Sequence, residues 1–352
     1  MWTSESMLSG SAAWLDASGP RSDVILSTRV RLARNVEGVP FPTRAGEDDL
    51  RAVRDRIRRA AAGSNYLANA LVIDMEEASA AIREVLIERH LASHGFARDD
   101  AGRAVVVGEK EIVSAMVNEE DHLRLQCIRS GLQPVDAWRL VDRIDREMDR
   151  NLHYAYSSDW GYLTACPTNV GTGVRVSVLA HLTALSRRKR IAQVLRSVSK
   201  LGLSVRGYYG EGSAALGGFF QISNQTTLGQ SEEDISYTVE RVASRIVGLE
   251  LEAREELTRR EGDRLADQIH RAYGVLANAR LVGSDECMRL SSMLRLGASL
   301  GLIERPDLAT ANRLLVATQP GHLRYAHGGD PAPEERDRMR ADLVRRELTA
   351  GD

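Results

Sequence analysis

The segment V-I-L-S-T-R-V-R-L, residues 24–32, is the first strongly periodic stretch of the chain. Its β-branched residues and its alternating pattern predict a β-strand. Successive side chains of a strand point to opposite faces. One face would therefore carry Ser27, Arg29 and Arg31, and the other Leu26, Thr28, Val30 and Leu32. This pattern indicates a sheet with an apolar face and a polar, cationic face.

A second strand is predicted at residues 112–117, and it stops at five polar residues, N-E-E-D-H. Alternation then resumes, with Leu123, Leu125 and Cys127 on one face and polar residues on the other. The pattern predicts a hairpin with an acidic apex. Such an apex is usually an exposed turn, but adjacent carboxylates also favour a nearby cation.

The composition is that of a soluble globular protein. Of 352 residues, 43% are hydrophobic and 27% charged, which is ordinary for that class. No apolar run approaches the roughly 18 residues of a membrane span, and no secretory signal pattern opens the chain. Three widely spaced cysteines, without a C-x-x-C pair, favour a reducing compartment, hence the cytoplasm. Collagen, coiled coil, membrane protein and wholesale disorder are excluded, and no protein-built metal site is expected.

The charge balance gives no sign of nucleic-acid binding. The formal net charge is −2, and the aromatic content of 5% supplies few stacking platforms. Of 47 basic residues only three are lysine, which leaves 44 arginines. Coding bias accounts for most of them, yet the planar guanidinium also suits phosphate better than an ammonium does.

Strand signals nearly disappear after about residue 255. Before it, strands are expected at 24–32, 104–107, 112–117, 122–127, 174–180, 203–208 and 218–223, and helices at 47–62, 75–91, 135–152, 182–201 and from 231 to about 260. After it, helices are expected near 263–281, 285–299, 307–317 and 334–348, with a Pro/Gly loop over 319–333. We therefore expect a leader at 1–20, an α+β domain at 21–255 and a helical domain at 256–352.

Five arginines of the predicted strands lie close to strand ends, beside acidic or glycine-rich loops: Arg29, Arg31, Arg124, Arg175 and Arg206. If the polar faces of one antiparallel sheet align, their guanidinium groups converge and suit a polyphosphate. The same arginines could also be solvated on the sheet surface. Spacing alone leaves both interpretations open.

Three more residues are candidates for chemistry. Cys166 lies in the loop T-A-C-P-T-N, where nearby arginines would favour its thiolate form, although a half-buried loop thiol is equally ordinary. Glu211 lies in a glycine-flanked loop, and His90 ends a predicted helix, where the dipole favours it. The usual phosphate-loop, dinucleotide, zinc-protease and serine-hydrolase motifs are absent.

Four motifs in order resemble those of the phosphagen (guanidino) kinases. They are S-T-R-V-R-L-A-R-N at 27–35, N-E-E-D-H-L-R at 118–124, C-P-T-N at 166–169 and R-G-Y-Y-G-E at 206–211. The similarity is greatest to the bacterial protein-arginine kinase branch. It implies an α+β catalytic domain with an antiparallel sheet flanked by helices, like that of glutamine synthetase, followed by a helical C-terminal domain.

The resemblance also implies roles for individual residues. Glu120 would align the acceptor guanidinium and take its proton, while Glu211 and the Cys166 thiolate hold it. ATP with Mg²⁺ would bind through Ser27, Thr28, Arg29, Val30, Arg31, His90, Arg124, Arg175, Val176, Ser177, Val178, Leu179, Arg206, Gly207, Tyr208, Tyr209, Gly210 and Glu211.

Two departures from the small-molecule kinases point to a protein substrate. The first catalytic strand begins near residue 24, which leaves no room for their N-terminal helical domain, and Tyr209 stands where they carry another arginine. In the last helix, R-D-R-M-R-A resembles a motif implied to bind phosphoarginine allosterically, through Arg336, Asp337, Arg340 and Ala341. A salt-bridged surface helix is the alternative interpretation.

Together with the resemblance, these observations predict an ATP-dependent kinase that phosphorylates arginine side chains of proteins and acts as a homodimer. The resemblance implies an activator protein, a heat-shock repressor among the substrates, and products marked for a Clp-type unfoldase and protease in a stress response. No membrane partner and no direct nucleic-acid partner are expected. A kinase for a free guanidino metabolite and a non-catalytic phosphoarginine-binding adaptor remain as alternatives.

Overall fold

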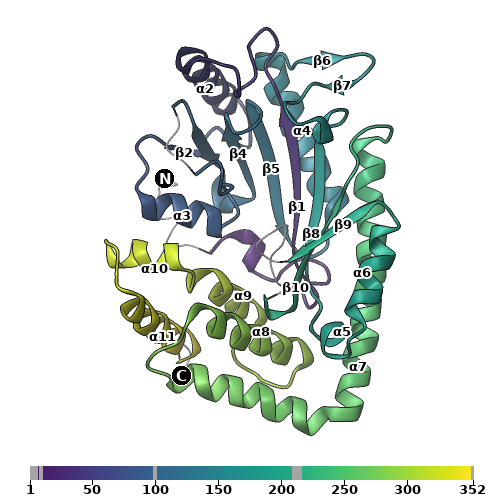
Figure 1. Cartoon of the computed structure of the whole chain (residues 1–352), viewed down its shortest axis with the longest axis vertical. Coiled ribbons are helices and arrows are strands. Elements are labelled where there is room, and N and C mark those ends of the chain that lie inside the picture. Colours follow the sequence, from purple (N-terminus) through teal and green to yellow (C-terminus); the bar gives the residue numbers. More distant parts are fainter. Residues whose placement is uncertain (1–6, 8–10, 98–100, 208–215, 350–352) are drawn as a thin grey trace.

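An eight-stranded sheet dominates the computed structural model, which describes residues 7, 11–97, 101–207 and 216–349 (Figure 1). The strand order is β2-β3-β4-β5-β1-β8-β10-β9, and all neighbouring strands pair antiparallel. The strands are β1 Ile25–Arg34, β2 Leu71–Asp74, β3 Ala104–Val107, β4 Val113–Val117, β5 Leu123–Ser130, β8 Val174–His181, β9 Leu203–Gly207 and β10 Phe219–Asn224. A small separate sheet pairs β6 Tyr156–Ser157 with β7 Gly161–Tyr162.

The strand β1 lies in the middle of the sheet, between β5 and β8. Val30 and Leu32 are buried in the main core, as the alternation predicts. A register shift between Ile25 and Ser27 forms a bulge, and Leu26 consequently leaves the apolar face expected for it. Leu26 packs instead with residues of the other face, in a cluster that includes Ile128.

Helices cover one face of the sheet. On the opposite face they cover only one end. The helices are α2 Glu47–Ala62, α3 Ala80–Glu88, α4 Pro134–Leu152, α5 Thr183–Arg187, α6 Ile191–Ser199, α7 Glu232–Asn278, α8 Ser284–Leu300, α9 Leu308–Ala317, α10 Pro320–His327 and α11 Pro333–Thr349. The core beneath α4 and α7 draws apolar side chains from β1, β5 and β8. The expected antiparallel sheet flanked by helices is thereby confirmed.

The C-terminal helices form a group of their own at the lower end of the sheet in Figure 1. The end of α7, with α8, α9 and α11, encloses a second apolar core around Leu276, Leu294 and Val344. Among the described residues, none of the helices combines the length and the apolar character that crossing a membrane requires. The segment from residue 11 to 20 is also packed, because Trp14 is fully buried and lies 5.4 Å from His90 between ring centroids.

Several helices differ from the periodicity-based expectation. The two helices expected at 231–260 and 263–281 are one helix, α7, with a local departure from helical geometry at Glu261 (φ −133°, ψ 23°). The Ser231 side chain caps it by accepting from the Asp234 amide, as predicted. The helix expected at 182–201 is interrupted between α5 and α6, and the expected Pro/Gly loop contains α10. The short strand β2 was not anticipated.

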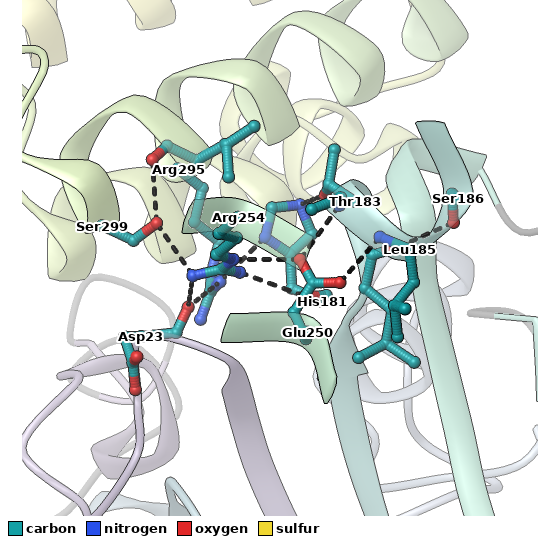
Figure 2. A network of polar contacts seen from close by, with 12 residues as sticks. Asp23, His181, Thr183, Leu185, Ser186, Glu250, Arg254, Arg295 and Ser299 are labelled. Carbon is teal, nitrogen blue, oxygen red and sulfur yellow. Dashed lines mark hydrogen bonds and ion pairs between the residues drawn. The ribbon is translucent and has the colours of Figure 1, made fainter. Parts of the chain in front are cut away.

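A buried polar network joins the eight-stranded sheet to the C-terminal helices (Figure 2). Arg254 of α7 donates to the Glu250 carboxylate and to the carbonyls of Asp23 and His181. Arg295 of α8 donates to the same Asp23 carbonyl and lies 3.0 Å from Nδ1 of His181. Glu250 also accepts from two backbone amides in the first turn of α5. The network ties an N-terminal loop, β8, α5, α7 and α8 together.

Candidate active site

A cavity of about 1140 Å³ lies between the open face of the sheet and the C-terminal helices. It brings together eight of the residues that the sequence singles out: Arg29, Arg31, His90, Glu120, Arg124, Cys166, Arg175 and Arg206. They come from segments far apart in the chain. The convergence of the five strand arginines, left open by spacing alone, is therefore found in the fold.

Strand register explains why the arginines meet. Arg31 lies directly opposite Arg175 across the β1–β8 pair, so their side chains stand on the same face. Arg124 is on β5, two strands from β8, and Arg206 lies opposite Gln221 across the β9–β10 pair. Like charges placed opposite one another destabilise a sheet. This arrangement therefore carries a cost in the unliganded protein.

The charges of Arg29 and Arg31 are only partly compensated, by attraction to Glu119. Within the described residues, neither side chain has an ion pair or a side-chain hydrogen bond. Burial lowers the pKa of Arg29 to about 10, and repulsion from Arg124 and Arg175 adds to the effect. Burial lowers the pKa of Arg31 well below its usual value, and repulsion from Arg29, Arg124 and Arg175 adds to the effect. A partly buried cluster of unpaired guanidinium groups favours binding of a multivalent anion.

The three carboxylates of the acidic apex between β4 and β5 differ in their partners and in their exposure. Glu119 is bonded to Arg124 and to the Ser93 hydroxyl; burial opposes ionisation, but these partners prevail and lower its pKa. Asp121 accepts from the Asn35 amide at 2.6 Å and from the Ala165 backbone at 2.7 Å. Burial raises the pKa of Asp121. Glu120 alone is exposed to the cavity.

The hydrogen bond that Asp121 accepts from the Ala165 amide also positions Cys166. The Ala165 amide, adjacent to Cys166 in the chain, is held against the apex carboxylate. The Cys166 sulfur lies 3.0 Å from the Thr168 hydroxyl and lines the cavity. The loop and the apex are thus locked together, with Glu120 and Cys166 on the same cavity wall.

His90 follows α3 in a left-handed conformation, with φ 60°. Its carbonyl accepts from Gln126 at 2.9 Å. Burial, reinforced by Arg29 and Arg31, lowers the pKa of His90 to about 3. The imidazole is consequently neutral at physiological pH.

Other residues implied by the resemblance lie at the margins of the cavity or away from it. Ser27, Ser177 and Leu179 line a small adjoining pocket with Arg29 and His90, and Gly207 lines a neighbouring groove with Arg206. Thr28, Val30, Val176 and Val178 are buried on the helix-covered face, so their side chains do not reach the cavity. Tyr208, Tyr209, Gly210 and Glu211 lie outside the described residues.

The C-terminal helices contribute cavity residues that sequence reasoning placed elsewhere or missed. Arg336 of α11 lines the cavity, whereas Arg340 is buried and donates to the carbonyls of Thr318 and Val282 and to Asp337. Arg324 of α10 lines the cavity as well, together with Glu88 of α3, against which α10 packs. No local pattern marks Glu88 or Arg324, since they reach the site only through packing between distant helices.

Family comparisons cover nearly the whole chain. Residues 52–253 match the family described as ATP:guanido phosphotransferase, C-terminal catalytic domain, and residues 262–352 match the protein-arginine kinase McsB C-terminal domain. The chain is 44% identical over 338 residues to a protein-arginine kinase of Pelotomaculum thermopropionicum, covering 95% of both chains. It is 43% identical over 347 residues to one of Moorella thermoacetica, covering 98% of this chain and 99% of the other.

Solved structures show the same fold. Lombricine kinase matches with a TM-score of 0.60 at 24% identity, over 67% of this chain and 70% of the other. The duplicated taurocyamine kinase of Schistosoma mansoni, with bound transition-state analogue components, matches with a TM-score of 0.59 at 26% identity, over 69% of this chain and 35% of the other. With the arginine-lined cavity and the matches along its length, the chain belongs to the ATP:guanido phosphotransferase family of phosphotransferases and, within it, to the protein-arginine kinases.

Proposed function

We propose that this protein transfers the γ-phosphoryl group of ATP to arginine side chains of other proteins. The observation that carries the proposal is the cluster of Arg29 and Arg31 guanidinium groups, which are only partly compensated, beside Arg124 in one cavity with Glu120 and Cys166. Polyphosphate supplies the negative charge that this cluster lacks. The exposed carboxylate supplies the base that an acceptor guanidinium requires.

The chemistry follows from these positions. A guanidinium is cationic and a poor nucleophile, so it must be oriented and must lose a proton as it attacks. Glu120 takes that proton, a nitrogen–phosphorus bond forms, and the bond from the γ-phosphorus to the oxygen of the leaving ADP breaks. The resemblance implies that Cys166 and Glu211 hold the acceptor, and Glu211 lies outside the described residues. Phosphoryl transfer depends mainly on positioning and charge stabilisation, which the arginines provide.

Mg²⁺ fits this site as an ion carried by the phosphates. Among the described residues, no group of three or more His, Cys, Asp or Glu side chains is arranged to hold a metal. Mg²⁺ commonly uses substrate phosphates, waters and one or two carboxylates rather than a protein cage. When bound, it neutralises charge on the transferring phosphoryl group.

The nucleotide is proposed to lie along β1 and β8, toward His90. The small pocket lined by Ser27, Ser177 and Leu179 has a volume of about 20 Å³, which suffices for a water molecule but not for a nucleoside. The uncharged part of ATP is therefore placed in the adjoining 1140 Å³ cavity, next to His90. Arg175 and Arg206 then face the phosphates from the other side. Neutral His90 suits an uncharged partner better than a phosphate.

A protein acceptor is supported by the relatives. Chains 43–44% identical over nearly their full length are named protein-arginine kinases. The two family matches, to residues 52–253 and 262–352, support the division into a catalytic unit at 21–255 and a C-terminal unit at 256–352. Helix α7 nevertheless runs continuously through that boundary. The free-metabolite kinase remains the second candidate, since structural neighbours are kinases of small guanidino compounds.

Regulation and cellular role are proposed on the resemblance. Arg336 and Asp337, with Arg340 and Ala341, would bind phosphoarginine, and half-buried Arg336 is the member of this set that the cavity exposes. Buried Arg340 would support the site from behind. We further propose a cytoplasmic homodimer with an activator protein, a heat-shock repressor among its substrates, and delivery of its products to a Clp-type protease in the stress response.

The first test offers ATP with Mg²⁺ and either an arginine-rich unfolded protein or free arginine, followed by ³¹P NMR for an acid-labile N-phosphate. Signal on the protein is expected. Glu120→Gln should lower turnover on the order of 10²- to 10⁴-fold, the usual contribution of a general base, with little change in ATP affinity. Cys166→Ala should behave similarly.

The other outcomes separate the alternatives. Signal only on free arginine would assign the enzyme to the metabolite kinases. No transfer to either acceptor, with phosphoarginine still bound, would favour an adaptor. Equal loss of turnover and ATP binding in Glu120→Gln would show that the residue serves the nucleotide site instead.

A further inference from the structure

The helices α3 and α10 lie against each other, although they are separated by more than 200 residues in the chain (Figure 1). The contact is made by Glu88, the last residue of α3. Its carboxylate accepts from the Gly321 amide at 2.6 Å and from the His322 amide at 3.0 Å, and lies 2.6 Å from Nδ1 of His322. Since Pro320 has no N–H, these are the first amides that α10 presents. Glu88 therefore caps a helix of the C-terminal region from within the catalytic region.

The fit between the helices leaves no room for a side chain at Gly321. A Cβ atom there would lie 2.6 Å from Cβ of Glu84 and 3.0 Å from Cδ of Glu88. The backbone of α10 thus rests directly on α3. Any shift of α10 is transmitted to α3, because tightly packed helices cannot absorb it locally.

A second polar link runs beside the cap. Arg324 of α10 pairs with Glu84 of α3, and its Nε lies 2.9 Å from Asp330. Asp330 in turn lies 3.9 Å from the Arg336 guanidinium of α11. The contact between α3 and α10 is thereby connected to the helix that carries the proposed phosphoarginine motif.

The chain that follows Glu88 forms the edge of the active-site cavity. His90 lies two residues beyond it and Ser93 five residues beyond it, and both line the cavity. Ser93 donates to Glu119, which also pairs with Arg124. The position of α3 consequently determines the placement of His90 and of the support behind one phosphate-facing arginine.

We propose that Glu88 is a positioning residue for the phosphotransfer reaction. By capping α10 it fixes residues 88–93, so that docking of the C-terminal helices sets the affinity of the cavity for ATP. This inference rests on the proposed function, because it assumes that the cavity binds ATP. Under this proposal, the contact between α3 and α10 couples the catalytic region to the C-terminal helices.

The test compares full-length Glu88→Gln and Gly321→Ala with wild type. The first variant removes the capping charge, and the second keeps that charge but separates the helices. We expect the Kd for ATP with Mg²⁺, measured by calorimetry, to rise about tenfold in each, within the range usual for coupling between sites. The KM for ATP should rise more than kcat falls. By reciprocity, ATP should slow hydrogen exchange in α10 of wild type more than in either variant.

Glu347→Gln is the matched control. Glu347 pairs with Arg313 at 3.5 Å, a contact between α11 and α9 away from the cavity. This variant should keep the wild-type Kd. If both test variants melt like wild type and bind ATP with unchanged affinity, the inference is overturned. It is also overturned if the variant preparations merely contain a smaller proportion of active protein, so that kcat is reduced while the KM for ATP is unchanged. Failure of wild type to bind ATP would instead refute the proposed function.

Discussion

At the residue scale, burial decides which side chains keep their charge. The imidazole of His122 is fully buried; its Nδ1 accepts from the Val36 amide at 3.1 Å, and its Nε2 lies 3.0 Å from the Pro40 carbonyl. Burial lowers the pKa of His122 to about 4, although the Pro40 bond opposes the shift. His90 is held neutral in the same way, with a pKa of about 3. Both rings are neutral in the fold at pH values where the unfolded chain would be protonated.

This difference predicts a loss of stability in acid. An unfolded histidine takes up its proton near pH 6.5, whereas folded His122 does so only near pH 4. Between these values the unfolded state binds more protons, so the free energy of unfolding falls as pH falls, by up to about 1.4 kcal/mol per pH unit for each such histidine. Urea unfolding from pH 7 to pH 4.5 should show a shallower slope for His122→Gln than for wild type. Parallel slopes would contradict the assignment.

At the element scale, glycines in helices have different roles that helical periodicity does not distinguish. Gly297 of α8 faces α7, and a Cβ atom there would lie 2.5 Å from Cγ2 of Ile269. Gly274 of α7 has no atom within 4 Å of the corresponding position. The first glycine permits two helices to approach closely, while the second only lowers the helix propensity of α7.

Alanine substitution should therefore change stability in opposite directions at the two sites. Gly297→Ala is expected to destabilise the protein by about 1–3 kcal/mol, because the added methyl group overpacks the α7–α8 contact. Gly274→Ala is expected to stabilise it by about 0.5–1 kcal/mol through the unfolded chain and helix propensity. Denaturant unfolding of the two variants measures both effects. Equal changes of the same sign would show that the α7–α8 distance is not restricted at Gly297.

At the scale of the whole molecule, the catalytic sheet and the C-terminal helices are connected by buried charge as well as by apolar packing. The Glu250 and Arg254 side chains are 0% and 2% exposed, and their 2.9 Å ion pair is extended by bonds to β8 and to the N-terminal loop (Figure 2). A buried pair is not strongly stabilising relative to apolar packing. Removing one partner, however, leaves the other charge without compensation.

Arg254→Ala should consequently destabilise the chain by about 3–5 kcal/mol, the usual cost of breaking a buried pair. Arg260→Ala is the control, because its pair with Glu256 on the same helix is exposed at the arginine and should contribute at most about 0.5 kcal/mol. Thermal and denaturant unfolding of both variants provide the measurement. A small effect of Arg254→Ala would mean that the network is dispensable.

Much of the fold could be predicted because its signals are local. Strand β3 and helix α2 begin and end where periodicity indicated, since alternation and helical spacing require only neighbouring residues. Helix α10 was missed because proline and glycine weaken its local signal, and its cap comes from Glu88 on a distant helix. Leu26 was assigned to the wrong face because a bulge changes the alternation without any mark in the sequence.

The sequence by itself determined the sheet, the arginine-bearing strands, the acidic apex and the kinase family, because each depends on residue type and short-range order. Only the tertiary structure decided that Arg29 and Arg31 stay unpaired in one cavity and that Glu120 is the exposed carboxylate of its run. It also decided that α10 and α11 form part of the cavity wall. These features depend on which distant surfaces pack together, and local patterns of residues do not encode that choice.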